Sequence, residues 1–106
     1  MNEAEFVSAS RTILDGVASF TLATVDQGGH PWASPVYFAA IEWTLYFLSS
    51  PKSRHSNNIE STASVAASLY PEAQDWKAIQ GLQMEGVAGR VHDDEEHARA
   101  LSAYLA

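Results

Sequence analysis

The sequence predicts a mainly β domain of the α+β class, with five strands between a helix at each end of the chain. Apolar residues recur at helical spacing up to Val17, and from Ser19 onward the period changes to two, as expected for half-buried strands. Turn-forming residues at positions 26–29 separate the first two alternating segments. A chain of 106 residues with 46% hydrophobic composition is long enough for one core, so residues 1–106 are expected to form a single domain.

Capping residues mark both terminal helices. Asn2 is placed to cap the first helix, with Glu5 as its capping-box partner, and this helix is expected to end near Gly16. Asp93 and Asp94 are placed to cap the last helix, whose acidic first turn suits the helix dipole. Three apolar residues of the last helix are expected to face inward: Ala98, Leu101 and Leu105.

The strands are expected at residues 19–25, 32–41, 44–48, 64–70 and 81–91. The first three follow one another through short turns and predict a meander, with the second turn at Glu42 and Trp43. Pro35 lies inside the second strand, and because proline donates no ladder hydrogen bond it belongs at an edge, a bulge or a ligand contact. Most large aromatic residues here are expected to be buried in the core or in a dimer interface: Trp32, Tyr37, Phe38 and Trp43.

The charge balance restricts the classes of partner. Six Lys and Arg residues stand against thirteen Asp and Glu residues, which gives a net charge of −7 and argues against binding to nucleic acid or to an anionic membrane surface. The absence of cysteine excludes disulfides and Cys-ligated zinc. The N-terminus lacks the basic and apolar pattern of a signal peptide, and a cytoplasmic location is therefore expected.

The segment 49–59 concentrates anion-binding chemistry in this acidic chain. Lys52 and Arg54 lie within three residues of each other, beside His55 and among serines and asparagines. The segment follows an apolar strand at 45–48 and leads into a short helix that ends near Ile59. A strand, a polar loop and a helix N-terminus gather backbone N–H donors and cations around one point. This arrangement predicts a site for one small anion such as a phosphate group.

Other clusters of polar residues carry weaker chemical signals. His92 and His97 are five residues apart, which on a helix places them on different faces, unlike the four-residue spacing of zinc helices. They are therefore interpreted as part of a charged helix start, and no metal site is expected. No serine lies in a Gly-x-Ser-x-Gly motif, and no catalytic acid or base is assigned. Trp76, in a polar loop, is expected to reach a partner subunit.

Four segments in the same order resemble the pyridoxamine 5'-phosphate oxidase-like flavin-binding superfamily: residues 22–26, 29–38, 45–59 and 82–91. The resemblance implies a split β-barrel, an FMN held at a homodimer interface and oxidoreductase chemistry on a small substrate. The chain stops at Ala106, where relatives usually continue into at least one further strand, so the barrel is expected to be C-terminally truncated.

The resemblance also implies which residues contact the flavin. The backbone beside the isoalloxazine ring would be that of Pro35, Val36, Tyr37 and Phe38. The pyrimidine side of the ring or the ribityl chain would be closed by Ser49 and Ser50. The phosphate would be held by Lys52, Ser53, Arg54 and His55. True pyridoxamine phosphate oxidases carry a basic residue where this chain has His55, and they have an arginine-rich C-terminal segment that this chain lacks, so pyridoxamine phosphate oxidation is not the expected reaction.

Three classes of function remain open from the sequence. The first is a small FMN-dependent oxidoreductase, in which the flavin carries the chemistry and the protein supplies binding and orientation. The second is a non-catalytic module that binds or carries a flavin, a haem or a deazaflavin. The third is a cofactor-free dimerisation scaffold. The substrate and the electron donor are not identified by the sequence.

Overall fold

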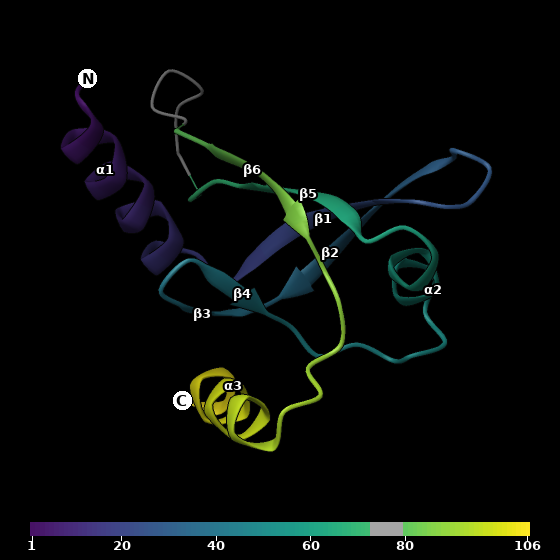
Figure 1. Cartoon of the computed structure of the whole chain (residues 1–106). Helices are drawn as coiled ribbons and strands as arrows, with labels where there is room; N and C mark the ends of the chain where they lie inside the picture. The colour runs from purple at the N-terminus through teal and green to yellow at the C-terminus, as the bar shows by residue number, and fades with distance from the viewer. Residues whose placement is uncertain (73–79) are drawn as a thin grey trace.

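The computed structural model describes residues 1–72 and 80–106 (Figure 1). Along the chain the elements are α1 (Glu3–Gly16), β1 (Ser19–Val25), β2 (Pro31–Tyr37), β3 (Ala39–Ile41), β4 (Thr44–Tyr46), α2 (Arg54–Ser61), β5 (Ser64–Leu69), β6 (Leu82–Val87) and α3 (Asp94–Leu105). The predicted loop that bears Trp76 lies outside the described residues. No helix in the described ranges is long and apolar enough to cross a membrane.

The strands form two sheets that make up a split β-barrel. The larger sheet has the strand order β2-β1-β5-β6, and all its neighbouring strands are antiparallel. The smaller sheet is the antiparallel hairpin β3-β4. Helices α1 and α3 stand at the two ends of the chain, and α2 lies between β4 and β5 (Figure 1). The predicted fold class, a mainly β split barrel flanked by helices, is confirmed.

The predicted strand at 32–41 is wrong as a single element. The ladder of β2 ends at Tyr37, the Phe38 N–H donates to the Ala18 carbonyl, and β3 then pairs only with β4. The chain therefore has six described strands instead of five, and the expected meander is divided between two sheets. The strands predicted at 44–48 and 81–91 are shorter, since β4 ends at Tyr46 and β6 ends at Val87.

The core lies between the larger sheet, the C-terminal end of α1 and the β3-β4 hairpin. Its fully buried apolar residues are Leu14, Phe20, Leu22, Val36 and Leu69. The ring of Phe20 meets Phe38 edge-to-face at 5.2 Å and Phe47 at 6.1 Å between centroids, a geometry that aromatic pairs favour. The residues that flank the β3-β4 hairpin, Phe38 and Phe47, thus both pack against the Phe20 ring of the larger sheet.

The helix starts predicted from capping residues are confirmed. Asn2 Oδ1 accepts the Glu5 N–H at 2.8 Å, and the Asn2 amide donates to the Glu5 carboxylate at 2.8 Å. Asp93 caps α3 by accepting the Glu96 N–H at 2.9 Å. Because each cap is made within one helical turn, local sequence was sufficient to predict it.

The burial of α3 differs from the prediction, and most of the aromatic residues expected in the core or in a dimer interface are exposed in the single chain. Trp32, Tyr37 and Trp43 are 41%, 69% and 47% exposed, so only Phe38 of the expected set is largely covered. In α3, Leu101 is half-buried, whereas Ala98 is exposed and Leu105 is 71% exposed. The helical spacing was read correctly, but in the described chain no further layer covers these side chains.

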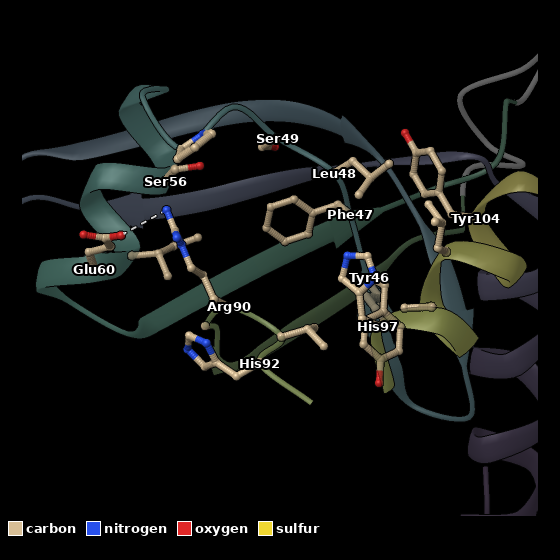
Figure 2. Close-up of a pocket in the computed structure, with 17 residues that line it drawn as sticks. Tyr46, Phe47, Leu48, Ser49, Ser56, Glu60, Arg90, His92, His97 and Tyr104 are labelled. Carbon is tan, nitrogen blue, oxygen red and sulfur yellow. Dashed lines mark ion pairs between the residues drawn. The ribbon is translucent and has the colours of Figure 1, made fainter. Parts of the chain in front are cut away.

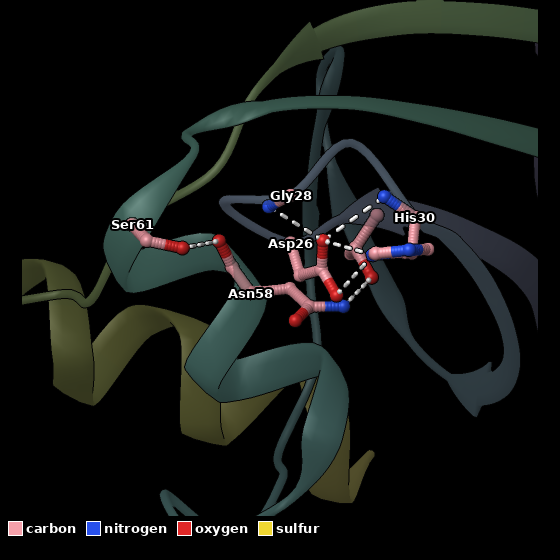
Figure 3. A network of polar contacts seen from close by, with 6 residues as sticks. Asp26, Gly28, His30, Asn58 and Ser61 are labelled. Atoms are coloured by element: carbon pink, nitrogen blue, oxygen red, sulfur yellow. Dashed lines mark hydrogen bonds and ion pairs between the residues drawn. The ribbon is translucent and has the colours of Figure 1, made fainter.

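A buried hydrogen bond attaches α2 to the larger sheet (Figure 3). Asn58 is 5% exposed, and its Nδ2 donates to Oγ1 of Thr24, which is 3% exposed, at 3.0 Å. The adjoining β1-β2 turn is closed by Asp26, whose Oδ1 accepts the N–H groups of Gly28 and His30 at 2.8 and 2.9 Å. These hydrogen bonds, the one from His30 foremost, lower the pKa of Asp26. The turn and the helix are thereby fixed relative to one another.

We predict that Asn58→Ala destabilises the fold by about 1 to 3 kcal/mol, because the Thr24 hydroxyl loses its buried partner. Asn57→Ala is the matched control, since Asn57 is the exposed neighbour on the same helix and its replacement should change stability by no more than about 0.5 kcal/mol. Urea unfolding of both variants measures the difference. Equal destabilisation by the two substitutions would contradict the assigned role of Asn58.

Candidate functional site

The polar loop before α2 is held by hydrogen bonds between residues that are close in sequence. The Ser50 carbonyl accepts the Ser53 N–H at 3.0 Å, and Ser50 Oγ accepts the Lys52 N–H at 3.2 Å. Ser53 is the N-cap of α2, and its Oγ accepts the Ser56 N–H at 3.3 Å. Since the first N–H groups of a helix have no intrahelical partner, those of Arg54 and His55 stay open to a ligand. The predicted helix N-terminus is confirmed.

The cations of this loop have no ion-pair partner among the described residues. Lys52 and Arg54 are exposed, and neither forms an ion pair within residues 1–72 and 80–106. By contrast, Arg11 pairs with Asp15 at 2.9 Å and Arg90 pairs with Glu60 at 3.6 Å. In a chain of net charge −7, two adjacent uncompensated cations form a local positive site.

Arg54 and His55, the first two residues of α2, direct their side chains to different partners. The Arg54 guanidinium carbon lies 4.1 Å from the centre of the Trp32 ring on β2. His55 Nε2 lies 2.7 Å from Ser49 Oγ, and the His55 ring meets the edge of Phe47 at 6.1 Å. Arg54 is therefore oriented by the larger sheet, whereas His55 closes the loop against the segment that follows β4.

The predicted flavin-facing residues 35–38 fall into two groups, one with packed side chains and one with exposed side chains. Val36 is 8% exposed and belongs to the core, and Phe38 packs on Phe20. Pro35 and Tyr37 are exposed. Because β2 is an edge strand of the described sheet, its outer backbone edge is open to a ligand. Tyr37 and Phe38 line a cavity of about 490 Å³ beside the ends of α1 and α3, a different cavity from the one that Ser49 lines.

A cavity of about 750 Å³ lies among the described residues (Figure 2). It lies between the segment from β4 to α2 on one side and the segment from β6 through α3 on the other. Ser49 and Ser56 line it at the α2 end, and the Arg90–Glu60 pair is beside them. Its remaining wall is mainly apolar and aromatic, with residues that include Phe47, Leu48, Ile59, Leu101 and Tyr104.

His92 and His97 both line this cavity (Figure 2). The prediction that they are part of a charged helix start on separate faces is wrong for His92, because α3 begins at Asp94 and His92 lies in the preceding linker. The helical spacing rule therefore does not apply to the pair. Among the described residues, no group of three or more His, Cys, Asp or Glu side chains is arranged to hold a metal ion.

A hydrogen bond joins β4 to α3. Tyr46 Oη donates to Glu96 Oε2 at 2.6 Å, and this bond raises the pKa of Tyr46, with partial burial as the next cause. None of the α3 residues is fully buried in the described chain. The Tyr46–Glu96 bond is consequently a principal specific contact that holds α3 against the hairpin.

Sequence reasoning missed several residues that the structure brings to this region. Trp32, which was expected in the core or in a dimer interface, carries the Arg54 guanidinium over its ring. The sequence contained a signal for the position of Trp32, because the tight turn at 26–30 pairs Trp32 with Thr24 across the hairpin. Arg90 and the Tyr46–Glu96 pair gave no signal, since each depends on contacts between segments far apart in the sequence.

The two antiparallel sheets, with a polar loop that leads into the capped start of α2, define the split-barrel class of fold. The family model described as pyridoxamine 5'-phosphate oxidase matches residues 6–106, and the chain therefore belongs to this family. No curated protein matches the sequence.

Solved structures share the fold over most of the chain. A heme-binding protein from Mycobacterium smegmatis is 27% identical, with a TM-score of 0.85 over 93% of this chain and 41% of that protein. The heme storage protein HutZ from Vibrio cholerae is 24% identical, with a TM-score of 0.78 over 90% of this chain and 70% of HutZ. A protein of unknown function from Agrobacterium tumefaciens is 24% identical, with a TM-score of 0.83 over 99% of this chain and 46% of that protein. The chain thus spans less than half of the first and third proteins.

We predict that Tyr46→Phe weakens the docking of α3 and destabilises the fold below about pH 10, the ordinary pKa of tyrosine. A tyrosine whose pKa is raised by folding contributes stability below its unfolded pKa, and this contribution falls as the pH rises through the folded pKa. The stability difference between the wild type and Tyr46→Phe should therefore shrink above about pH 10. Urea unfolding from pH 7 to pH 11 tests this, with Tyr37→Phe as the exposed control; equal stability of the wild type and Tyr46→Phe at pH 8 would refute it.

Proposed function

We propose that this chain is an FMN-binding domain that supports oxidation or reduction of a small substrate. The observation that carries the proposal is the pair of cations at the capped N-terminus of α2, Lys52 and Arg54, which form no ion pair within residues 1–72 and 80–106. Membership of the pyridoxamine 5'-phosphate oxidase family supports a flavin as the ligand. This chain has His55 where true pyridoxamine phosphate oxidases carry a basic residue, so a different small substrate is proposed.

The residues at the loop fit a phosphate group. The open N–H groups of Arg54 and His55 point out of the helix N-terminus, where the helix dipole favours negative charge. The Arg54 guanidinium offers two parallel donors to phosphate oxygens, and Lys52 adds a mobile point charge. His55 binds Ser49 in the structure, so its proposed contribution comes from its backbone N–H and from holding the loop closed.

The remainder of the flavin would lie against the open edge of β2 and near Ser49 and Ser50. Bound FMN supplies hydride or electron transfer, while the protein supplies binding and orientation. The side chains of Val36 and Phe38 are committed to the core, so within residues 35–38 the backbone and the exposed Tyr37 would make the contacts. No catalytic side chain is assigned to this chain.

A second candidate function is haem binding, and it is favoured by the walls of the 750 Å³ cavity. His92 and His97 supply imidazole ligands beside apolar and aromatic side chains, a combination that suits a haem iron and its macrocycle. Two proteins described as heme-binding and heme storage proteins share the fold. In this case the domain would bind or carry haem, with or without turnover.

We also propose that the functional unit is a homodimer. The exposed face of the larger sheet carries small side chains on β2, β1 and β5, in the rows Pro35, Thr21, Ser68 and Ala33, Ala23, Ala66, which end on β6 at Gln83 and Glu85. Val87 on β6 is 85% exposed, and Trp32 and Tyr37 are exposed at the opposite edge. A second copy would cover this surface and both open edges, and two-fold symmetry would give two equivalent sites.

We predict that Arg54→Glu weakens FMN binding by about 2 to 4 kcal/mol, through lost charge-assisted hydrogen bonds and new repulsion. Riboflavin, which has no phosphate, should bind almost as it does to the wild type. Arg99→Glu is the matched control, because Arg99 is exposed on α3 and likewise forms no ion pair among the described residues. Flavin fluorescence titrations measure the affinities of the wild type and both variants for FMN and for riboflavin; equal weakening of FMN and riboflavin by Arg54→Glu would show that the loop does not hold the phosphate.

For the haem candidate we predict that hemin titration produces a Soret band that depends on His97, His92 or both. His97→Ala or His92→Ala should then shift the band or abolish it, because an axial ligand to the iron is lost. His30→Ala is the control, since His30 lies in the β1-β2 turn outside the cavity. A Soret band unchanged in the double variant would exclude these ligands.

For the dimer we predict that Ala66→Arg shifts the protein toward monomer by at least about tenfold in dissociation constant, since it places a charge in the exposed face of the larger sheet. Ala98→Arg, on the exposed side of α3, should leave the assembly unchanged. Light scattering across a dilution series measures both. A wild-type protein that is monomeric at every concentration and still binds FMN one-to-one would overturn the shared-site proposal.

A further inference from the structure

Arg54 is held on the face of the Trp32 indole ring. The guanidinium carbon is 4.1 Å from the ring centroid, well within the range of about 6 Å for a cation–π contact. Arg54 has no carboxylate partner in the described parts of the chain, so this ring is its identified contact there. Trp32 itself remains 41% exposed.

The position of this stack follows from the attachment of α2. Arg54 and Asn58 are four residues apart and therefore lie on the same side of the helix. Asn58 donates to Thr24 at 3.0 Å, and Thr24 is directly opposite Trp32 in the β1-β2 ladder. Directly opposite residues of an antiparallel pair point to the same face of a sheet. The buried hydrogen bond thus places Arg54 one helical turn away, over the neighbouring Trp32 ring.

Stacking on an indole ring leaves the hydrogen-bonding edge of a guanidinium free. The face of the planar group contacts the ring, while its N–H groups point outward in the plane. A lysine ammonium has no such plane, so the geometry is particular to arginine. Holding a long side chain in its binding orientation also reduces the entropy that ligand binding would otherwise cost.

We infer that Trp32 is a positioning residue, which holds Arg54 as a planar fork for a phosphate monoester and thereby sets the preference for FMN over riboflavin. The inference rests on the proposed function of the loop. It assigns to β2 a role in the phosphate site that is separate from any contact with the isoalloxazine ring. The selectivity of the site would then depend on a residue that itself touches no phosphate oxygen.

A merely structural role for Trp32 makes a different prediction. If the stack only fastened α2 to the sheet, its loss would weaken FMN and riboflavin equally. If Trp32 positions Arg54, the ratio of the two affinities changes and the effect of Trp32 disappears once Arg54 is removed. A double-mutant cycle between the two residues therefore separates the two roles.

The experiment measures FMN and riboflavin affinities of the wild type, Trp32→Leu, Trp32→Phe, Arg54→Gln and the Trp32→Leu, Arg54→Gln double variant. We expect Trp32→Leu to weaken FMN roughly three- to tenfold while riboflavin is unchanged. Trp32→Phe should retain most of the FMN affinity, because an aromatic face remains. Trp43→Leu is the matched control, since Trp43 contacts Arg11 at 5.7 Å in a second Arg–Trp pair away from the loop.

Each outcome decides between the two proposals. Equal weakening of both ligands by Trp32→Leu, or the same loss with and without Arg54, would overturn the positioning role and leave the phosphate site standing. A silent Trp32→Leu in a protein whose FMN affinity depends on Arg54 would do the same. A wild type that binds no flavin through a phosphate group would overturn the proposed function, and the role of Trp32 with it.

Discussion

The hydrogen bond between Asn58 and Thr24 is the contact on which the candidate site depends. It is buried at both ends and joins α2 to the middle of the larger sheet, although the helix and the strand are far apart in sequence. Because this bond fixes the position of α2, it also fixes the positions of the helix N-terminus, of Arg54 and of the preceding loop. Loss of the Asn58–Thr24 bond would displace the open N–H groups, the Arg54 guanidinium and the Ser49–His55 contact together.

Charge distribution gives this geometry its chemical meaning. The chain is strongly acidic, and two of its arginines, Arg11 and Arg90, are paired with carboxylates. The cations of the α2 loop have no such partners in the described chain, and one of them rests on an aromatic ring that cannot neutralise it. Because exposed cations are hydrated, Lys52 and Arg54 need no protein partner for stability and remain available to a bound anion. The adjacent 750 Å³ cavity, with its two histidines, is a separate chemical environment.

Features that depend on a few neighbouring residues were predictable from the sequence. The caps at Asn2, Ser53 and Asp93 and the polar loop before α2 belong to this group, because each is decided within one turn of chain. The break of the second strand at Phe38 was not predictable, because it follows from packing against Phe20 and from the separate pairing of β3 with β4. The exposure of Trp32, Tyr37 and Trp43 in the single chain was not predictable for a related reason, because periodicity identifies a face but not whether another layer covers it. The 750 Å³ cavity was not predictable, because it is formed between α3, the linker before it and segments far away in the sequence.

The most direct test of the phosphate site is the phosphorus-31 NMR spectrum of FMN titrated with the protein. The account predicts that the phosphorus resonance shifts on binding and that the second pKa of the phosphate falls, because cations and N–H donors favour the dianion. Arg54→Glu should abolish both changes. An unchanged phosphorus resonance, under conditions where flavin absorbance shows that FMN is bound, would contradict the central claim that the start of α2 holds the phosphate.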